Sequence, residues 1–168
     1  MPTSRSAAEW IARLKLQPHP EGGYYRETYR SPQSLPATVL PAGLDGQRSL
    51  ATAVLFLLPG EDVSRLHRLR TDEIWCYHAG SSLTLHQFAP TGLYSRLRLG
   101  VDATGGACPQ VVIPADCWFG AIVDDREAFT LVSCCLAPGF EFADFELAER
   151  QALASAWPEH AELIGRLT

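Results

Sequence analysis

Hydrophobic and polar residues alternate over short stretches along most of the chain. In residues 24–30 the alternation predicts a strand with Tyr25, Glu27 and Tyr29 on one face. Residues 50–58 form a nearly continuous apolar run that ends at a Pro-Gly pair and predicts a core strand. The further predicted strands are residues 63–69, 73–78, 83–88, 94–99, 110–113, 119–123 and 129–136. Many short strands separated by turn residues predict a β-sandwich or barrel.

The first elements of the chain are a short helix and two irregular connections. Ser6 and Glu9 have the spacing of a capping box, and apolar residues follow at helical intervals, so residues 6–15 are predicted to form an amphipathic helix. Residues 16–23 contain two prolines and two glycines, which favour an irregular loop. Residues 31–47 contain three prolines and two glycines and are predicted to form a long connection.

Helical spacing returns after residue 139. It predicts a helix that starts near Ala143 or Asp144, and Pro158 is placed to begin a final short helix that reaches Leu167. The chain is therefore predicted to be mainly β, with helices at both ends. Its 168 residues, 46% of them hydrophobic, are enough for one core, so we expect a single domain over residues 1–168.

Composition narrows the classes of function. A net charge of −5 and a pI near 5.5 lack the basic surface that nucleic acid requires. The longest apolar run, residues 53–58, is too short to span a membrane, and the N-terminus lacks a secretory apolar segment, so we expect a cytoplasmic, soluble protein. Five cysteines without a CxxC pair favour reduced thiols. The single lysine, Lys15, lies on the predicted helix, which argues against Schiff-base chemistry.

The candidate chemistry lies in two neighbouring predicted strands. Period-2 alternation places Arg65 on the same face as His67. In the next strand Glu73, Trp75 and Tyr77 share a face. Antiparallel pairing would bring the histidine and the glutamate into one aromatic-lined cavity, which is typical of small-molecule sites. The alternative is a structural hydrogen-bonded pair that bridges two strands beside core aromatic residues.

The resemblance to a known family begins in this segment. Gly60, His67, Glu73 and Gly80 follow the order of the first motif of the cupin superfamily, which the segment resembles. Longer blocks resemble the DUF985 or cupin-5 family; they are residues 16–31, 66–69, 72–75, 118–121 and 137–148. The resemblance implies a cupin double-stranded β-helix, a jelly-roll barrel with any site inside its mouth, that usually forms a homodimer.

The sequence departs from the metal-binding cupins, which offer three histidines and one glutamate. His67 and Glu73 are kept, but Leu69 stands where the second histidine belongs and Phe119 lies near the position of the last one. Catalytic zinc takes three protein ligands plus water, and mononuclear iron takes a facial triad. We therefore predict no metal and no other cofactor. A metal-dependent cupin with non-standard ligands is the alternative.

The first functional hypothesis is a metal-independent isomerase, epimerase or lyase that acts on a sugar, a sugar nucleotide or a similar small polar substrate. His67 is the predicted general base, because an imidazole titrates near neutral pH. Glu73 would orient it, and Tyr25 or Tyr77 would return a proton on the opposite face of the substrate. The predicted substrate-binding residues are His19, Glu21, Arg26, Arg65, Trp75 and Phe119. The two arginines would hold a phosphate or a developing enolate.

The second hypothesis is a non-catalytic barrel that binds a small ligand. The incomplete metal motif and the absence of a GxSxG or P-loop signature favour it. The enzyme is preferred, because Glu21, Arg26, His67 and Glu73 are costly to bury in a barrel without use. Under both hypotheses we expect a small-molecule ligand and a homodimer, with neither nucleic acid nor a membrane as partner.

Overall fold

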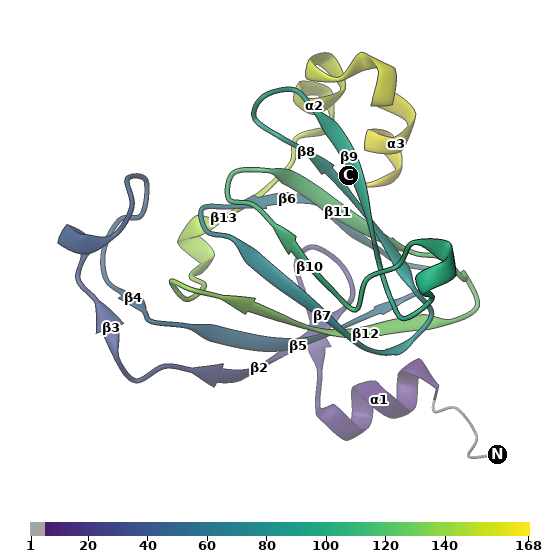
Figure 1. Cartoon of the computed structure of the whole chain (residues 1–168), viewed down its shortest axis with the longest axis horizontal. Helices are drawn as coiled ribbons and strands as arrows, with labels where there is room; N and C mark the ends of the chain where they lie inside the picture. The colour runs from purple at the N-terminus through teal and green to yellow at the C-terminus, as the bar shows by residue number, and fades with distance from the viewer. Residues whose placement is uncertain (1–5) are drawn as a thin grey trace.

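Two antiparallel β-sheets face each other in the computed structural model, which describes residues 6–168 (Figure 1). The first sheet contains, in spatial order, β1 (Gln17–Pro18), β2 (Tyr24–Arg30), β5 (Thr52–Pro59), β12 (Phe129–Leu136), β7 (Glu73–Gly80) and β10 (Gln110–Ile113). The second contains β13 (Phe145–Leu147), β6 (Val63–Leu69), β11 (Trp118–Val123), β8 (Leu83–Phe88) and β9 (Tyr94–Leu99). This arrangement is the predicted β-rich cupin fold.

Short elements complete the chain. An arm formed by β3 (Ser34–Leu35) and β4 (Arg48–Ser49) extends away from the two sheets (Figure 1). The helices are α1 (Ala7–Leu14), α2 (Arg150–Ala156) and α3 (Ala161–Arg166), and the 3-10 turns are η1 (Ala37–Val39), η2 (Ala103–Gly105), η3 (Phe142–Asp144) and η4 (Pro158–His160). No helix in residues 6–168 has the length and apolar character needed to cross a membrane.

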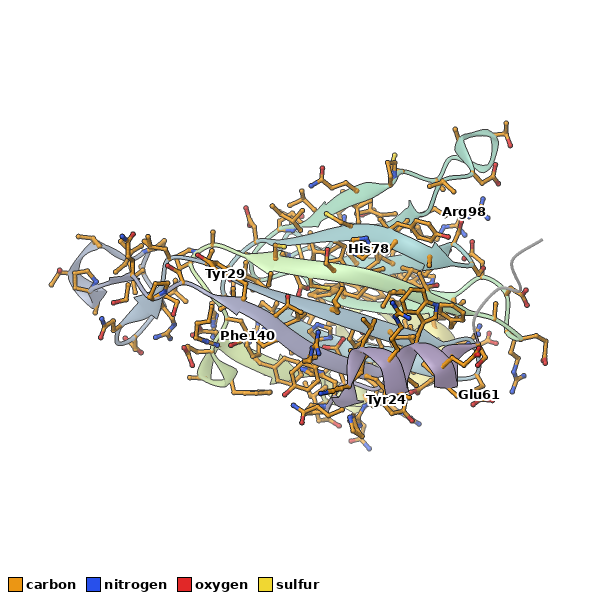
Figure 2. The ribbon with its side chains drawn as sticks, turned by 90° about the horizontal axis from the view of Figure 1, so that it is seen from below. Tyr24, Tyr29, Glu61, His78, Arg98 and Phe140 are labelled. Atoms are coloured by element: carbon orange, nitrogen blue, oxygen red, sulfur yellow. The ribbon has the colours of Figure 1, made fainter. Side chains whose placement is uncertain are left out.

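The hydrophobic core has three parts. The largest lies between the sheets and includes Phe56, Leu85 and Val132. Helix α1 covers part of the outer face of the first sheet, where Tyr24 lies beside it while Tyr29 lies farther along β2, clear of the helix (Figure 2). Helices α2 and α3 cover the outer face of the second sheet. Strands covered on both faces account for the continuous apolar runs in the sequence.

Helix α1 begins as its sequence predicts. The Ser6 side chain accepts a hydrogen bond from the Glu9 backbone N–H, and the Glu9 carboxylate accepts one from the Ser6 backbone, which completes a capping box. Lys15 ends the helix in the left-handed conformation. The predicted helix over residues 6–15 is therefore confirmed, with its two terminal residues acting as caps.

The C-terminal prediction is wrong at its start. Residues 145–147 form strand β13 rather than the beginning of a helix, and α2 starts only at Arg150. Strand β13 pairs with β6, with Phe145 opposite Leu69 and Leu147 opposite His67. The open edge of β6 carries unpaired backbone groups, and pairing with them outweighs the helical spacing of the apolar side chains.

A β-bulge on β6 changes which side chains face inward. On β6, Phe119 pairs with His67 but Ala121 pairs with Ser64, so two residues of β6 lie opposite Gly120 alone. A side chain at Gly120 would meet the Ser64 carbonyl oxygen at 2.7 Å, so glycine is required there. The bulge brings Ser64 and His67, three residues apart, onto one face and turns Arg65 outward to solvent.

Candidate functional site

A cavity of about 280 Å³ lies between the sheets at one end of the barrel. Its walls come from strands β1, β2, β5, β6, β7, β12 and β13, from the loop that holds His19 and Glu21, and from the residues that follow β12. The segment that follows β12 includes Phe140, which lies beside β2 (Figure 2). The cavity therefore occupies the position that the family resemblance implies for a site.

Glu21 is the polar centre of the cavity wall. Its side chain is almost fully buried, and Ser64 Oγ donates a hydrogen bond of 2.9 Å to its Oε1. Its Oε2 lies 3.3 Å from Nε2 of His67 and 3.3 Å from Nδ1 of His19. Burial raises the pKa of Glu21, but the two histidines and the serine outweigh burial, so the pKa is lowered overall. The carboxylate is therefore ionised at neutral pH.

His67 has both ring nitrogens occupied. Its Nδ1 lies 2.7 Å from the carbonyl oxygen of Arg65, so Nδ1 carries a proton and donates it. Its Nε2 lies 3.3 Å from Oε2 of Glu21, so the carboxylate occupies the space beside this nitrogen. The sequence correctly places His67 inside the barrel, but its buried partner is Glu21 rather than Glu73. The imidazole has no free nitrogen for a ligand, which does not fit the predicted general base.

His19 is the second imidazole of the cavity. Its side chain is nine-tenths buried, and its Nδ1 lies 3.3 Å from both the backbone nitrogen and the Oε2 of Glu21. A protonated Nδ1 can donate to the carboxylate, and an unprotonated Nδ1 can accept from the backbone N–H. Its Nε2 has no hydrogen-bond partner within residues 6–168. His19 therefore has a partner for Nδ1 in either protonation state and a free Nε2.

Glu73 is a neutral acid in the same cavity. Trp75 Nε1 donates a hydrogen bond of 2.8 Å to its Oε2. Burial, and then the charge of Glu21, raise the pKa of Glu73 to about 8, against the opposing effects of Trp75 and Cys134. The carboxyl group therefore carries a proton at neutral pH. Two glutamates in one cavity thus have opposite protonation states.

Of the three remaining aromatic residues predicted for the site, one lines the cavity and two do not. Tyr25 lines the cavity, with its ring centroid 4.6 Å from that of His19. Phe119 is buried beside His67, at 4.1 Å between ring centroids, and is not part of the cavity lining. Tyr77 packs against the core, and its hydroxyl donates to the carbonyl oxygen of Gly80 at 2.5 Å. The structure therefore leaves Tyr77 outside the cavity.

The two arginines predicted to hold an anion do not reach the cavity. Arg65 is exposed and donates to the carbonyl oxygen of Pro20, because the β6 bulge turns it outward. Arg26 is half-buried and is also absent from the lining. The prediction from period-2 alternation that Arg65 points into the cavity is therefore wrong.

A charged cluster at the cavity was missed by sequence reasoning. Arg30 donates to Glu27 through Nε at 3.0 Å and Nη2 at 2.8 Å, to Glu141 through Nη1 at 2.7 Å, and to the carbonyl oxygen of Phe140 at 3.1 Å. Alternation places Glu27 and Arg30 on opposite faces of β2. A bulge at Thr28 shifts the register and brings them together.

The donor set does not fit a bound metal ion. Leu69 lines the cavity where the metal-binding cupins carry a histidine, and Phe119 packs behind His67. Both nitrogens of His67 are occupied by protein groups. Within residues 6–168 no group of three or more His, Cys, Asp or Glu side chains is arranged to hold a metal.

The facing sheets and the polar cavity at one end of the barrel define a protein of the cupin class. The chain belongs to the Cupin superfamily (DUF985) family, whose model matches residues 8–148. The sequence-based recognition of this family is thereby confirmed. A curated relative is the uncharacterized protein YML079W of Saccharomyces cerevisiae, 27% identical over 148 residues, which are 83% of this chain and 73% of the relative.

Solved structures share the fold. Protein SO0799 from Shewanella oneidensis is 38% identical with a TM-score of 0.88, and the match covers 98% of each chain. A hypothetical protein from Leishmania major is 35% identical, with a TM-score of 0.88 over 98% of this chain and 99% of the other. Oxalate decarboxylase of Bacillus subtilis, at 14% identity and a TM-score of 0.54 over 90% of this chain and 36% of the other, is similar in fold alone.

Proposed function

We propose that the cavity binds a small carbonyl compound and moves a proton on it, as metal-independent isomerases, epimerases and lyases do. The observation that carries the proposal is the pair of complementary groups in one cavity. Glu73 holds a proton at neutral pH, and His19 has a free Nε2 backed by the Glu21 carboxylate. Groups whose environments separate their protonation states in this way are suited to acid and base roles.

The proposed step is an enolisation. His19 Nε2 takes the proton from the carbon next to the carbonyl group, and its Nδ1–H donates to Glu21, which stabilises the imidazolium. The electron pair of the broken C–H bond moves toward the carbonyl oxygen, to which the Glu73 carboxyl group donates its proton. Return of a proton to carbon completes an isomerisation or epimerisation. His67 and Ser64 act as positioning residues that hold Glu21.

In this mechanism the base is His19 rather than His67, and the cavity lining limits the class of substrate. A sugar nucleotide needs a free cation for its phosphates, and neither Arg26 nor Arg65 lines the cavity. Arg30 does line it, but four of its N–H groups already donate to protein oxygens. We therefore favour a carbonyl compound without a phosphate group. The predicted homodimer and cytoplasmic location remain predictions.

The test is hydrogen–deuterium exchange at carbon. Small carbonyl compounds are incubated with the protein in deuterated buffer, and NMR follows the loss of the proton next to the carbonyl group. We expect acceleration by the wild-type protein and a loss of about 100-fold or more in His19→Gln, since positioned acid–base groups contribute about 10²–10⁴-fold. His78→Gln, an exposed histidine on the outer side of β7, is the matched control and should keep full activity (Figure 2).

The outcomes separate the two functional classes. Exchange that is unchanged in His19→Gln would rule out the proposed base. A compound that binds, raises the melting temperature and is recovered with its C–H bonds unexchanged would instead support the non-catalytic binding barrel.

A further inference from the structure

The charged groups of the cavity are predominantly acidic. Four carboxyl groups line it, and within the described residues Arg30 is its single arginine or lysine. Glu27 and Glu141 share that one guanidinium, so the three together carry one net negative charge. The Glu21 carboxylate lies 3.3 Å from Nε2 of His67. An anionic ligand would therefore meet carboxylates without a free cation to offset them, whereas a cation would be attracted.

Aromatic rings form the other wall of the cavity around His19. The His19 ring stacks on Phe142 at 6.1 Å between centroids and makes edge contacts with Tyr25 at 4.6 Å and Phe145 at 5.7 Å. Phe140 and Phe142 meet at 5.0 Å with their planes at 78°. Rings held at steep angles to one another present both faces and edges to a shared space. Ring faces attract ammonium groups.

Phe142 connects the aromatic wall to the outside. It lies on the 3-10 turn η3 and, although it lines the cavity, its side chain is 53% exposed. The exposed part of its ring is accessible to a ligand that enters the cavity. Glu141 is its neighbour in the chain, so a carboxylate and an aromatic ring stand side by side in sequence at the same part of the wall.

We infer that the ligand of this cavity is a small organic cation, an ammonium compound held between the carboxylates of Glu27 and Glu141 and the aromatic rings around Phe142. The inference rests on the proposed function in taking this cavity as the ligand site, and it adds the chemical class of the ligand. A volume of about 280 Å³ limits the ligand to a small molecule. Combined with the proposed chemistry, the substrate is a carbonyl compound that carries an ammonium group.

The test compares two probes of the same shape. Choline carries a quaternary ammonium, and 3,3-dimethylbutan-1-ol replaces the nitrogen by carbon and is neutral. Isothermal titration calorimetry at pH 7 measures both affinities, with inorganic phosphate as the anionic probe. We expect choline to bind about ten-fold more tightly than the alcohol, which lies between the sizes of exposed and desolvated cation–π contacts, and phosphate not to bind.

A matched pair of variants assigns the effect to the ring. Phe142→Leu keeps an apolar side chain but removes the π system, and Phe142→Tyr keeps it. Both should fold, because this side chain is half exposed. We expect Phe142→Leu to lower choline affinity about five-fold and to leave the affinity for the alcohol unchanged, while Phe142→Tyr retains choline binding.

Several results would overturn the inference. These are equal or tighter binding of the alcohol, no detectable choline binding at millimolar concentration, preferential binding of phosphate, or equal choline affinity in Phe142→Leu. Proton exchange on neutral carbonyl compounds without choline binding would leave the proposed function standing and reject only the cationic ligand. Choline binding without exchange on any ammonium-bearing carbonyl compound would leave the cationic ligand standing and reject the proposed proton transfer.

Discussion

At the scale of the residue, Glu21 and Glu73 show how a shared cavity separates two identical side chains. Both are buried, and burial favours the neutral form of each. Glu21 has two imidazoles and a hydroxyl within hydrogen-bonding reach, which together outweigh burial. Glu73 has an indole and a thiol, which do not, and it also faces the charge of Glu21. The number and charge of the hydrogen-bond donors therefore decide which glutamate ionises.

The raised pKa of Glu73 predicts a pH-dependent stability. The group titrates near its ordinary 4.5 in the unfolded chain and at about 8 in the folded protein. Its contribution is fully present below pH 4.5 and is lost as the pH rises through 8, because the unfolded state releases the proton first. The total change is about 3–5 kcal/mol. Glu73→Gln lacks this loss, so its melting temperature relative to wild type should rise from pH 5 to pH 8.

The matched control for this measurement is Glu61→Gln, an exposed glutamate in the turn between β5 and β6 (Figure 2). Its melting temperature should follow that of the wild type at every pH. A constant difference between Glu73→Gln and wild type across the range would show that Glu73 is ionised throughout and cannot act as the proposed acid.

At the scale of the element, period-2 alternation predicts where strands lie better than which way their side chains point. The bounds of β6 are those expected from the sequence, and His67 and Glu73 face inward as predicted. The bulges on β2 and β6 are invisible to alternation, because an extra residue shifts the pattern without changing the composition of the strand. They account for the missed Arg30 and the misplaced Arg65.

Contacts between segments that are distant in the chain also could not be predicted from the sequence. Nothing in residues 16–23 indicates that Glu21 reaches Ser64 and His67, because the loop is irregular and its path depends on what it packs against. Glycines fix that path. Gly22 has a φ of +108°, and a side chain there would collide with the backbone of Val63. The family resemblance supplied the barrel, but the internal pairing of the site came from tertiary contacts alone.

The turn η3 depends on a buried ion pair. Arg48, on β4 of the arm, donates to both carboxylate oxygens of Asp144 at 2.8 and 2.7 Å, and both side chains are buried. We expect Asp144→Asn to destabilise the protein by about 3–5 kcal/mol, because it leaves a buried guanidinium without its counter-charge. The free energy of unfolding in urea measures this loss.

A double variant tests whether the charges themselves are needed. Arg48→Met with Asp144→Leu replaces the pair by apolar side chains and should recover most of the stability, since no buried charge remains unpaired. Loss equal to that of Asp144→Asn would show instead that the hydrogen bonds of Arg48 to the carbonyl oxygens of Asp45 and Gln47 hold the arm in place.

At the scale of the whole molecule, the cavity and the C-terminal helices lie on opposite faces of the second sheet. The cavity opens between the sheets, while α2 and α3 pack on the outer face of the second sheet (Figure 1). Backbone hydrogen bonds tie this cover to β6, from Leu66 N–H to the Leu167 carbonyl oxygen and from Ala148 N–H to the Leu66 carbonyl oxygen. The helices therefore stabilise the strand that carries His67 without touching the cavity.

This separation predicts that stability and binding respond differently to one substitution. Ile164 is fully buried under the helices, so Ile164→Ala should cost about 2–5 kcal/mol in the free energy of unfolding. Choline affinity at 15 °C, where the variant remains folded, should stay within about two-fold of wild type, since sites without shared contacts are nearly independent. Val101→Ala, at a 70% exposed position, is the control and should change neither quantity. A large loss of choline affinity in Ile164→Ala would show that the two faces of β6 are coupled.

The position of His19 Nδ1, 3.3 Å from a buried carboxylate oxygen of Glu21, has a consequence for the energy of proton transfer at Nε2 of the same ring. An acid–base group in water must wait for solvent dipoles to turn each time its charge changes. Here the carboxylate that stabilises the charged imidazole already lies beside the neutral one. The reorganisation that water would require at every cycle was completed when the chain folded.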